Sequence, residues 1–163
     1  MYLRNMEEIR HRFMLRCFKS TGKWLGLSIV IGSLIALLHN WAFHYPLFPQ
    51  KLYPFAFLAA AIGASEELLF RGYIQGQLRL LNPLFAGFFA AFSHSLYKTC
   101  LFILPAESYD YSLAYLFILT FVVGLFFAWI TEKSKSIYPA LLAHALFDIL
   151  VYGALKVAPY WVF

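Results

Sequence analysis

Glu66, Glu67 and Arg71 place two carboxylates and one guanidinium inside a stretch of the chain that is otherwise apolar. An α-helix advances about 100° per residue, so Glu67 and Arg71 share a face and are predicted to form an ion pair. Glu66 then points about a quarter-turn away, toward the interior of a helical bundle, and is expected to have no cation beside it. A carboxylate of this kind is suited to act as a general base. The alternative is that all three residues form an inert ion cluster at the end of a helix.

Two other apolar segments each contain a histidine. His94 lies about a dozen residues into one segment, and His144 lies early in another, four residues before Asp148. This spacing places His144 and Asp148 on one helix face. Ionisable side chains at membrane depth are costly and usually have a partner or a function. A hydrogen bond to a neighbouring helix explains a single histidine, but two histidines together with an acid pair favour a shared polar site.

These residues need long apolar helices to position them, and the composition favours such helices. Of the 163 residues, 62% are hydrophobic and 13% are charged, with a mean hydropathy of +0.69, whereas soluble domains are about 25% charged. A run of about 20 apolar residues is long enough to span a bilayer. We therefore predict an all-α, polytopic transmembrane bundle of five spanning helices, located at about 24–43, 53–71 and onward, 83–104, 111–131 and 137–158.

The basic residues predict how this bundle is oriented. Residues 1–23 alternate basic and apolar side chains, which predicts an amphipathic cytoplasmic segment on the membrane face or, alternatively, a disordered basic tail. Five spans place most of the remaining Lys and Arg residues on that same side, and Lys51, Lys98 and Lys156 at the opposite side or at outer helix ends. The prediction is an integral membrane protein with a cytoplasmic N-terminus and one transmembrane domain over residues 24–163. No segment is long enough to form a soluble basic face for nucleic acid.

Helix geometry also predicts where the polar residues meet. At 1.5 Å per residue, His144 lies about 10 Å and His94 about 18 Å from the cytoplasmic ends of their helices. Glu66 lies in the same inner half, so the three side chains are expected to converge in a cavity that opens toward the cytoplasm. Small residues in segment 59–65 allow the helices to approach closely there. His39, near the outer end of the first span, is interpreted as an interfacial residue.

Three motifs, each on a separate apolar segment, together resemble the CAAX prenyl endopeptidase and bacteriocin-processing family of intramembrane proteases, also called the Abi family. Its first motif, two Glu then three residues then Arg, matches 66–71, and its third, His then three residues then Asn or Asp, matches 144–148. Its second motif, Phe then three residues then His, is met in part. His94 is present, but Ala90 occupies the Phe position and Phe92 lies two residues before the histidine. The resemblance covers about residues 59–150.

The resemblance implies a role for each motif. In that family the first Glu and the second-motif His activate a water molecule, which assigns this task to Glu66 and His94, while His144 and Asp148 stabilise an oxyanion. An ionised Asp148 cannot donate a hydrogen bond, so it is either protonated, or orients His144, or helps to hold a cation. The family has been described both as metal-dependent and as glutamate-dependent. Zinc suits such ligands, although we favour a water activated by Glu and His with no obligatory cofactor.

The resulting prediction is an endopeptidase of the bacterial inner membrane that hydrolyses a peptide bond of a membrane-embedded or lipid-anchored substrate. Its partners are then the lipid bilayer and a membrane protein or lipidated peptide, with nucleic acid excluded and a homo-oligomer left open. Prenylated C-termini, bacteriocin leaders and C-terminal sorting tails all suit such a cavity. Two alternatives remain: a non-catalytic immunity or scaffold protein of the same fold, and a haem protein with His94 and His144 as axial ligands.

Overall fold

Helices are the regular elements of the part of the chain that the computed structural model describes, residues 13–15, 22–103 and 112–156. They are α2 (Gly22–Ala42), α3 (Pro54–Glu67), η2 (Leu68–Gln75), α4 (Gly76–Leu78), α5 (Pro83–Leu101), α7 (Leu113–Ser134) and α8 (Tyr138–Tyr152). The all-α prediction is confirmed for these residues, and each of the five predicted segments contains a helix. The predicted amphipathic segment 1–23 lies largely outside the described residues, although Met14 within it is buried and its carbonyl accepts a hydrogen bond from the amide of Ile137.

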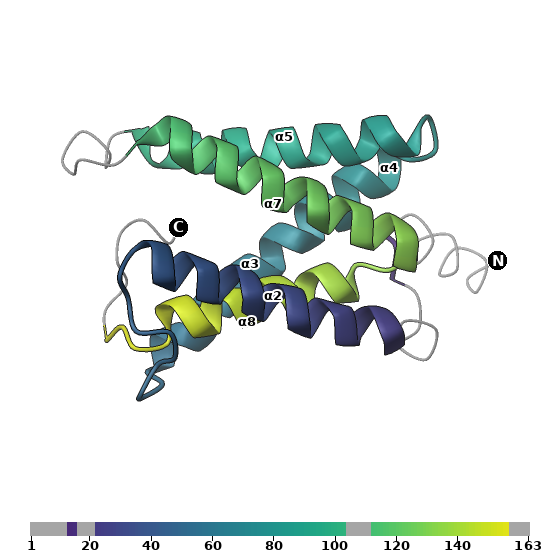
Figure 1. Ribbon diagram of the computed structural model, residues 1–163. Coiled ribbons are helices and arrows are strands. Elements are labelled where there is room, and N and C mark those ends of the chain that lie inside the picture. Colours follow the sequence, from purple (N-terminus) through teal and green to yellow (C-terminus); the bar gives the residue numbers. More distant parts are fainter. Residues whose placement is uncertain (1–12, 16–21, 104–111, 157–163) are drawn as a thin grey trace.

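Two pairs of helices are joined by a helix that crosses between them (Figure 1). One pair is α2 packed along α8, and the other is α5 packed along α7. The crossing helix runs from α3, which packs on α8, through η2, which packs on α5 and also meets α7, to α4. The second predicted segment is therefore a single long helical path that contacts both pairs.

The middle of this path, η2, is a π-helix. The sequence prediction assumed α-helical geometry throughout, so this local change was not foreseen. A π-helix bonds i to i+5 and is rare, and where it occurs it is often at a functional site. Here the transition begins directly after Glu67, at the point where the path passes from one helix pair to the other.

Local sequence signals fix where several helices begin. The side chain of Asn82 accepts hydrogen bonds from the amides of Leu84 and Phe85, at 2.9 and 3.0 Å, and so caps the first turn of α5. Pro83 follows at the first helical position, where its missing N–H does no harm. Ser112 caps α7 in the same way through the amide of Tyr115. The start of the predicted segment 83–104 is thereby confirmed.

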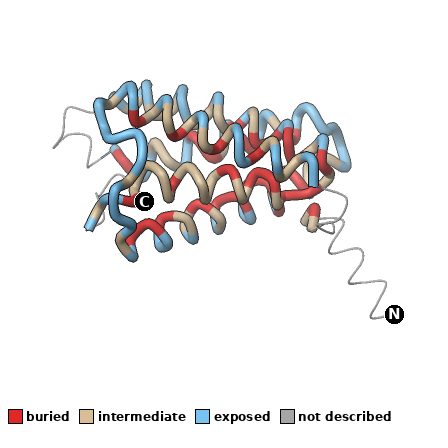
Figure 2. Tube along the Cα trace, turned by 60° about the horizontal axis from the view of Figure 1, so that its bottom comes forward, coloured by how far each residue is buried: buried red, intermediate tan, exposed pale blue. Residues whose placement is uncertain are grey.

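Apolar side chains cover the outside of the bundle as well as its interior. Figure 2 shows buried positions facing between the helices and exposed positions facing outward. In α2 the exposed positions include Ile29, Val30, Leu34 and Leu38, which is the pattern of a helix in contact with lipid. By length and composition, α2 and α7 are long and apolar enough to cross a membrane, while α8 is a shorter apolar helix.

The packing of α2 on α8 depends on a glycine at their contact. A Cβ atom at Gly32 would lie 2.4 Å from the carbonyl oxygen of Ala143 and 2.8 Å from its Cα. Neither backbone atom can move without shifting α8 itself. Because α8 also carries His144 and Asp148, this close approach helps to set the depth at which those side chains enter the bundle.

We expect Gly32→Ala to destabilise the protein and Gly26→Ala to leave it equally stable or slightly more stable. Overpacking at a rigid contact costs about 1–3 kcal/mol, whereas a Cβ at Gly26 meets no atom within 4 Å. Both glycines lie in α2, so the pair separates steric overlap from any change in helix propensity. Thermal unfolding of the detergent-solubilised variants measures the difference, and equal melting temperatures would disprove the tight α2–α8 contact.

Candidate active site

Arg71 lies at the centre of a cluster of ionisable side chains and has no exposure to solvent. Its guanidinium donates to Glu67 Oε1 at 3.1 Å and to the backbone carbonyl of Gly124 on α7 at 3.1 Å. The same guanidinium nitrogen that contacts Glu67 lies 2.9 Å from Nδ1 of His94. The predicted ion pair between Glu67 and Arg71 is confirmed, and it is part of a larger network that joins η2 to α5 and α7.

Glu67 connects this network to α8. Its carboxylate is fully buried, and Oε1 accepts a hydrogen bond from Nδ1 of His144 at 2.9 Å. Glu67, at the end of α3, thus contacts the Arg71 guanidinium one helical turn away and the His144 ring on α8. The Glu67 carboxylate therefore fixes the position of α3 relative to α8, two helices that are far apart in sequence.

Glu66 also has several partners, and its expected lack of a cation is wrong. Its Oε2 lies 3.3 Å from Nε2 of His94 and 3.9 Å from Nε2 of His144. Its Oε1 lies 2.7 Å from the ammonium of Lys98 on α5. The direction predicted for Glu66, toward His94 and away from Arg71, agrees with this geometry. The sequence argument missed Lys98 because it placed this residue at an outer helix end.

The hydrogen bonds assign the protons on the two histidines. Arginine only donates, so Nδ1 of His94 accepts from Arg71, and Nε2 carries the hydrogen that faces Glu66. His144 has the opposite arrangement, because a carboxylate bound to Arg71 only accepts and Nδ1 of His144 therefore donates to Glu67. Nε2 of His144 is left facing the space between Glu66 and Asp148.

Asp148 lies beside His144, as the i,i+4 spacing predicts. Its Oδ2 is 3.9 Å from Nε2 of His144, and the residue is buried. A Cβ atom at Gly63 on α3 would lie 2.3 Å from this same oxygen, so the glycine is what allows α8 to approach α3 here. This position favours the interpretation that Asp148 orients His144, one of the three roles that the sequence left open.

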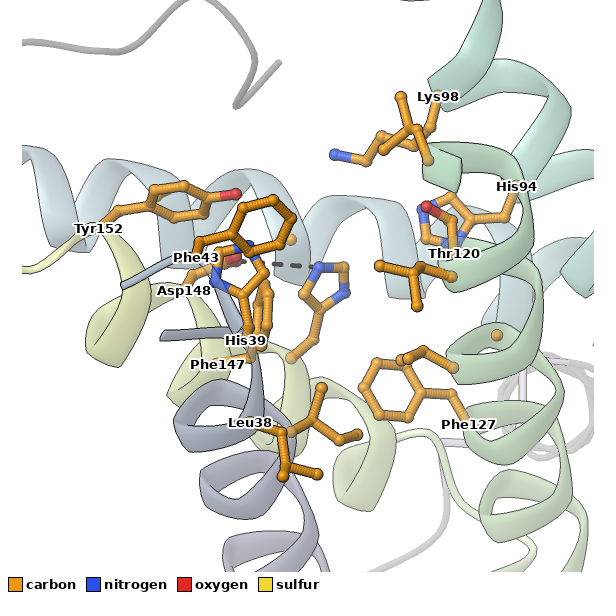
Figure 3. Close-up of a pocket in the computed structure, with 18 of the residues that line it drawn as sticks. Leu38, His39, Phe43, His94, Lys98, Thr120, Phe127, Phe147, Asp148 and Tyr152 are labelled. Atoms are coloured by element: carbon orange, nitrogen blue, oxygen red, sulfur yellow. Dashed lines mark ion pairs between the residues drawn. The ribbon is translucent and has the colours of Figure 1, made fainter. Parts of the chain in front are cut away.

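A large cavity of about 810 Å³ lies between the two helix pairs, and the site residues that line it are Arg71, His94, Lys98, His144 and Asp148. Figure 3 shows His94 and Lys98 entering it from α5, Phe127 and Thr120 from α7, and Asp148, Phe147 and Tyr152 from α8. Most of the other lining side chains are apolar or aromatic. The cavity therefore combines a charged floor with apolar walls.

The direction of the cavity differs from the prediction. From α2 it is lined by residues between Ile35 and Ala42, and from α7 by residues between Tyr115 and Phe127. It therefore extends toward the C-terminal end of α2, whereas the basic residues Lys133 and Lys135 lie at the other end of the bundle, where α7 ends. The cavity thus lies toward the end opposite these basic residues, which the sequence argument did not predict, because helix depth alone does not determine which end of a bundle is hollow.

His39 has contacts that the sequence argument did not predict. It lines the cavity, and its ring packs against Phe43, Tyr45 and Phe147 with centroid distances of 4.7, 6.2 and 5.6 Å. His39 lies in the last turn of α2, near the helix end as predicted, and it is also part of an aromatic group on the cavity wall.

The incomplete second motif has a structural substitute. Ala90 is fully buried, and Phe92 is 40% exposed and so does not cover the site. The ring that stacks on His94 belongs to Phe70 in η2, with a centroid distance of 4.6 Å. Phe70 lies directly before Arg71 in the first motif, and no sequence signal linked it to His94.

Glycine at position 124 is a further residue that the sequence argument missed. A Cβ atom there would lie 2.9 Å from the Arg71 guanidinium and 3.2 Å from Ala91. Because Gly124 has no side chain, Arg71 can reach the backbone of α7. An isolated glycine in an apolar helix was the available signal, but only the fold shows which side chain it accommodates.

The site residues do not form a metal-binding geometry of the usual kind. Within the described residues, no group of three or more His, Cys, Asp or Glu side chains is arranged to hold a metal ion. Cations already lie beside both glutamates, Arg71 at Glu67 and Lys98 at Glu66. The haem alternative is also not favoured, since both ring nitrogens of His94 have protein partners.

Comparison with known proteins identifies the family. The sequence profile described as type II CAAX prenyl endopeptidase Rce1-like matches residues 47–150, well over half of the chain. The match includes every residue of the charged network, from Glu66 on α3 to Asp148 on α8. No curated protein and no solved structure matches the chain. The family is membrane-embedded, in agreement with the apolar exterior of the bundle and its two long apolar helices. The chain belongs to the type II CAAX prenyl endopeptidase Rce1-like family.

Proposed function

We propose that this protein is an intramembrane endopeptidase in which Glu66 activates a water molecule to hydrolyse a peptide bond. The observation that carries the proposal is the position of the Glu66 carboxylate, which lies beside two histidines and a lysine that line an apolar cavity. Family membership supports a protease of the CAAX type.

The geometry supports a division of labour between the two glutamates. Glu67 is fully buried, and its Oε1 contacts both Arg71 and His144, so this carboxylate is enclosed by the framework. Glu66 instead contacts Lys98, which is partly exposed and lines the cavity. We assign the general base to Glu66 and a positioning role to Glu67.

His94 and His144 then act as partners of the base. His94 donates its Nε2–H to Glu66 and so orients the carboxylate, while Arg71 fixes the tautomer of the ring. His144 faces the same space through Nε2, and stabilisation of an oxyanion by this atom requires a proton on it, because Nδ1 already donates to Glu67. Asp148 lies 3.9 Å from the same Nε2, so a proton on this atom would also pair the ring with Asp148 and orient it.

The cavity suits a substrate with an apolar anchor. Its walls are lined by residues such as Leu38, Leu119, Phe127 and Phe147, so a lipid chain or a hydrophobic segment can occupy it while a peptide bond reaches the charged floor. We propose a membrane-embedded or lipid-anchored peptide as the substrate class. We further propose that five helical segments span the bilayer and that the protein resides in the bacterial inner membrane.

The proposed orientation places the basic end of the bundle in the cytoplasm. Basic residues favour the cytoplasmic side of a membrane, and Arg79, Lys133 and Lys135 cluster with Glu132 at the end of α7. Because the cavity extends toward the opposite end, the substrate then enters from the non-cytoplasmic half of the bilayer.

Glu66→Gln is expected to abolish cleavage while the protein remains folded. General base catalysis contributes about 10²–10⁴-fold to a rate, and glutamine keeps the size of the side chain but cannot accept the proton. Cleavage of an S-farnesylated fluorogenic peptide in proteoliposomes measures the rate. A mass-spectrometric comparison of membrane proteins from cells that carry either form then identifies the natural substrate. Full activity of Glu66→Gln, or its full complementation in cells, would favour a non-catalytic scaffold instead.

Glu67→Gln and Glu132→Gln are the matched controls for that experiment. Glu67→Gln removes the partner of a buried arginine, a change that typically costs about 3–5 kcal/mol, so it should lower the melting temperature as well as the activity. Glu132→Gln alters a more exposed acid at the end of the bundle and should change neither strongly. A Glu66→Gln variant as unstable as Glu67→Gln would contradict the division of labour.

Chelation is expected to leave the activity unchanged, because the proposed mechanism has no obligatory metal ion. The measurement compares cleavage by protein dialysed against EDTA and 1,10-phenanthroline with cleavage after zinc is restored. Loss of activity on chelation and recovery with zinc would show that a metal ion activates the water, with Glu66 acting on it or binding it.

Cysteine labelling tests the proposed orientation. Lys51 and Lys133 are exposed near opposite ends of the bundle, so each is replaced by cysteine after Cys17 and Cys100 are changed to serine. A membrane-impermeant maleimide should label Lys51→Cys in intact cells and Lys133→Cys only after lysis. The reverse pattern would place the cavity on the cytoplasmic side.

A further inference from the structure

Lys98 is a second cation of the site, and unlike Arg71 it does not connect several helices. Arg71 is fully buried and contacts Glu67, His94 and Gly124, so it is held in place on several sides. The Lys98 side chain is 15% exposed and lines the cavity, and among the described residues its recorded ion pair is with Glu66, at 2.7 Å. Figure 3 shows its ammonium projecting from α5 into the open space.

The position of this ammonium opposes a simple role in the resting site. A positive charge beside Glu66 stabilises the ionised carboxylate and makes it a weaker base. A purely structural lysine would therefore reduce the activity of the residue that we assign as the base. This cost is recovered only if the charge also stabilises a later state of the reaction.

The other donors near Glu66 are already committed. Nε2–H of His94 faces Glu66 itself, and the two terminal nitrogens of Arg71 contact Glu67, His94 and Gly124, while its Nε is buried without a partner among the described residues. Asp148 is an acceptor when ionised, and Nε2 of a neutral His144 is also an acceptor. Lys98 carries three N–H groups, and its contact with Glu66 leaves donors that can point into the cavity.

We propose that Lys98 is a further catalytic residue, which stabilises the oxyanion of the tetrahedral intermediate. This inference rests on the proposed function. When Glu66 takes a proton from water, the water oxygen bonds to the carbonyl carbon and the carbonyl electron pair moves onto its oxygen. The negative charge thus leaves Glu66 and appears on the oxyanion nearby, and the Lys98 ammonium follows it without transferring a proton. The C–N bond then breaks, and the proton on Glu66 passes to the leaving nitrogen.

The movement of charge explains why the ion pair is useful. In the resting site Lys98 interacts with a carboxylate, and in the intermediate that carboxylate is neutral, so the lysine loses little when it turns to the oxyanion. A preorganised donor in a water-poor site is more effective than one in water. Its flexible four-carbon side chain permits the short movement that is required.

Lys98→Met tests the proposal, with Lys51→Met as the matched control. Loss of one oxyanion donor typically lowers kcat about 10²–10³-fold, and KM should change little because the donor acts after substrate binding. Lys51 is exposed and outside the cavity lining, so Lys51→Met should retain the wild-type kcat. The assay uses the farnesylated peptide on which wild type and Glu66→Gln are compared.

Chemical rescue separates a catalytic role from a structural one. Lys98→Ala leaves space on the cavity wall, so ethylammonium should restore part of kcat to Lys98→Ala and none to Glu66→Gln. Lys98→Arg keeps the charge and should retain more activity than Lys98→Met, while melting temperatures check that each variant is folded.

Three results would overturn the inference: full kcat in Lys98→Met, an effect on KM alone, or a folded Lys98→Ala variant that amines do not rescue. Each leaves the proposed function intact if cleavage still depends on Glu66. Activity that survives Glu66→Gln would instead overturn the proposed function, so the two failures are distinguishable.

Discussion

A guanidinium without access to water is the constraint on which the rest of the bundle depends. Moving an ion into a protein interior costs several kcal/mol even after relaxation, and Arg71 has no exposure at all. The cost is offset by contacts from three other elements: the Glu67 carboxylate at the end of α3, the ring of His94 on α5 and the carbonyl of Gly124 on α7. Each partner lies on a different helix, so the requirement to satisfy one charge fixes how those helices pack.

The crossing helix makes this arrangement possible. Because α3 packs on α8 and η2 packs on α5, the residues at their junction contact both helix pairs. Glu67 at this junction reaches His144 on one side, and Glu66 reaches His94 on the other. The π-helical segment begins at the same point, and the small residues Gly63 and Gly124 remove the side chains that would otherwise separate the elements.

Two adjacent acids thereby obtain different environments. Glu67 is surrounded by the framework, whereas Glu66 lies beside a cavity of about 810 Å³ and is paired with a lysine that is partly exposed. Under the proposed function, Glu66 becomes neutral when it accepts a proton during the reaction, while the Lys98 ammonium remains charged and can interact with the oxyanion. The apolar walls of the cavity strengthen these interactions because they exclude water.

The sequence by itself determined the helical class, the membrane character, the positions of the helices and the three polar motifs, because these follow from local composition and from spacing along one helix. The pairing of Glu67 with Arg71 belongs to this group, since both residues are on one helix one turn apart. Contacts between helices depend on how the bundle folds, and only the tertiary structure decided them. It brought Lys98 to Glu66 and Phe70 to His94, and it turned the cavity away from the basic end of the bundle. The spacing of residues along one helix specifies which face they share, but it does not specify what lies opposite that face.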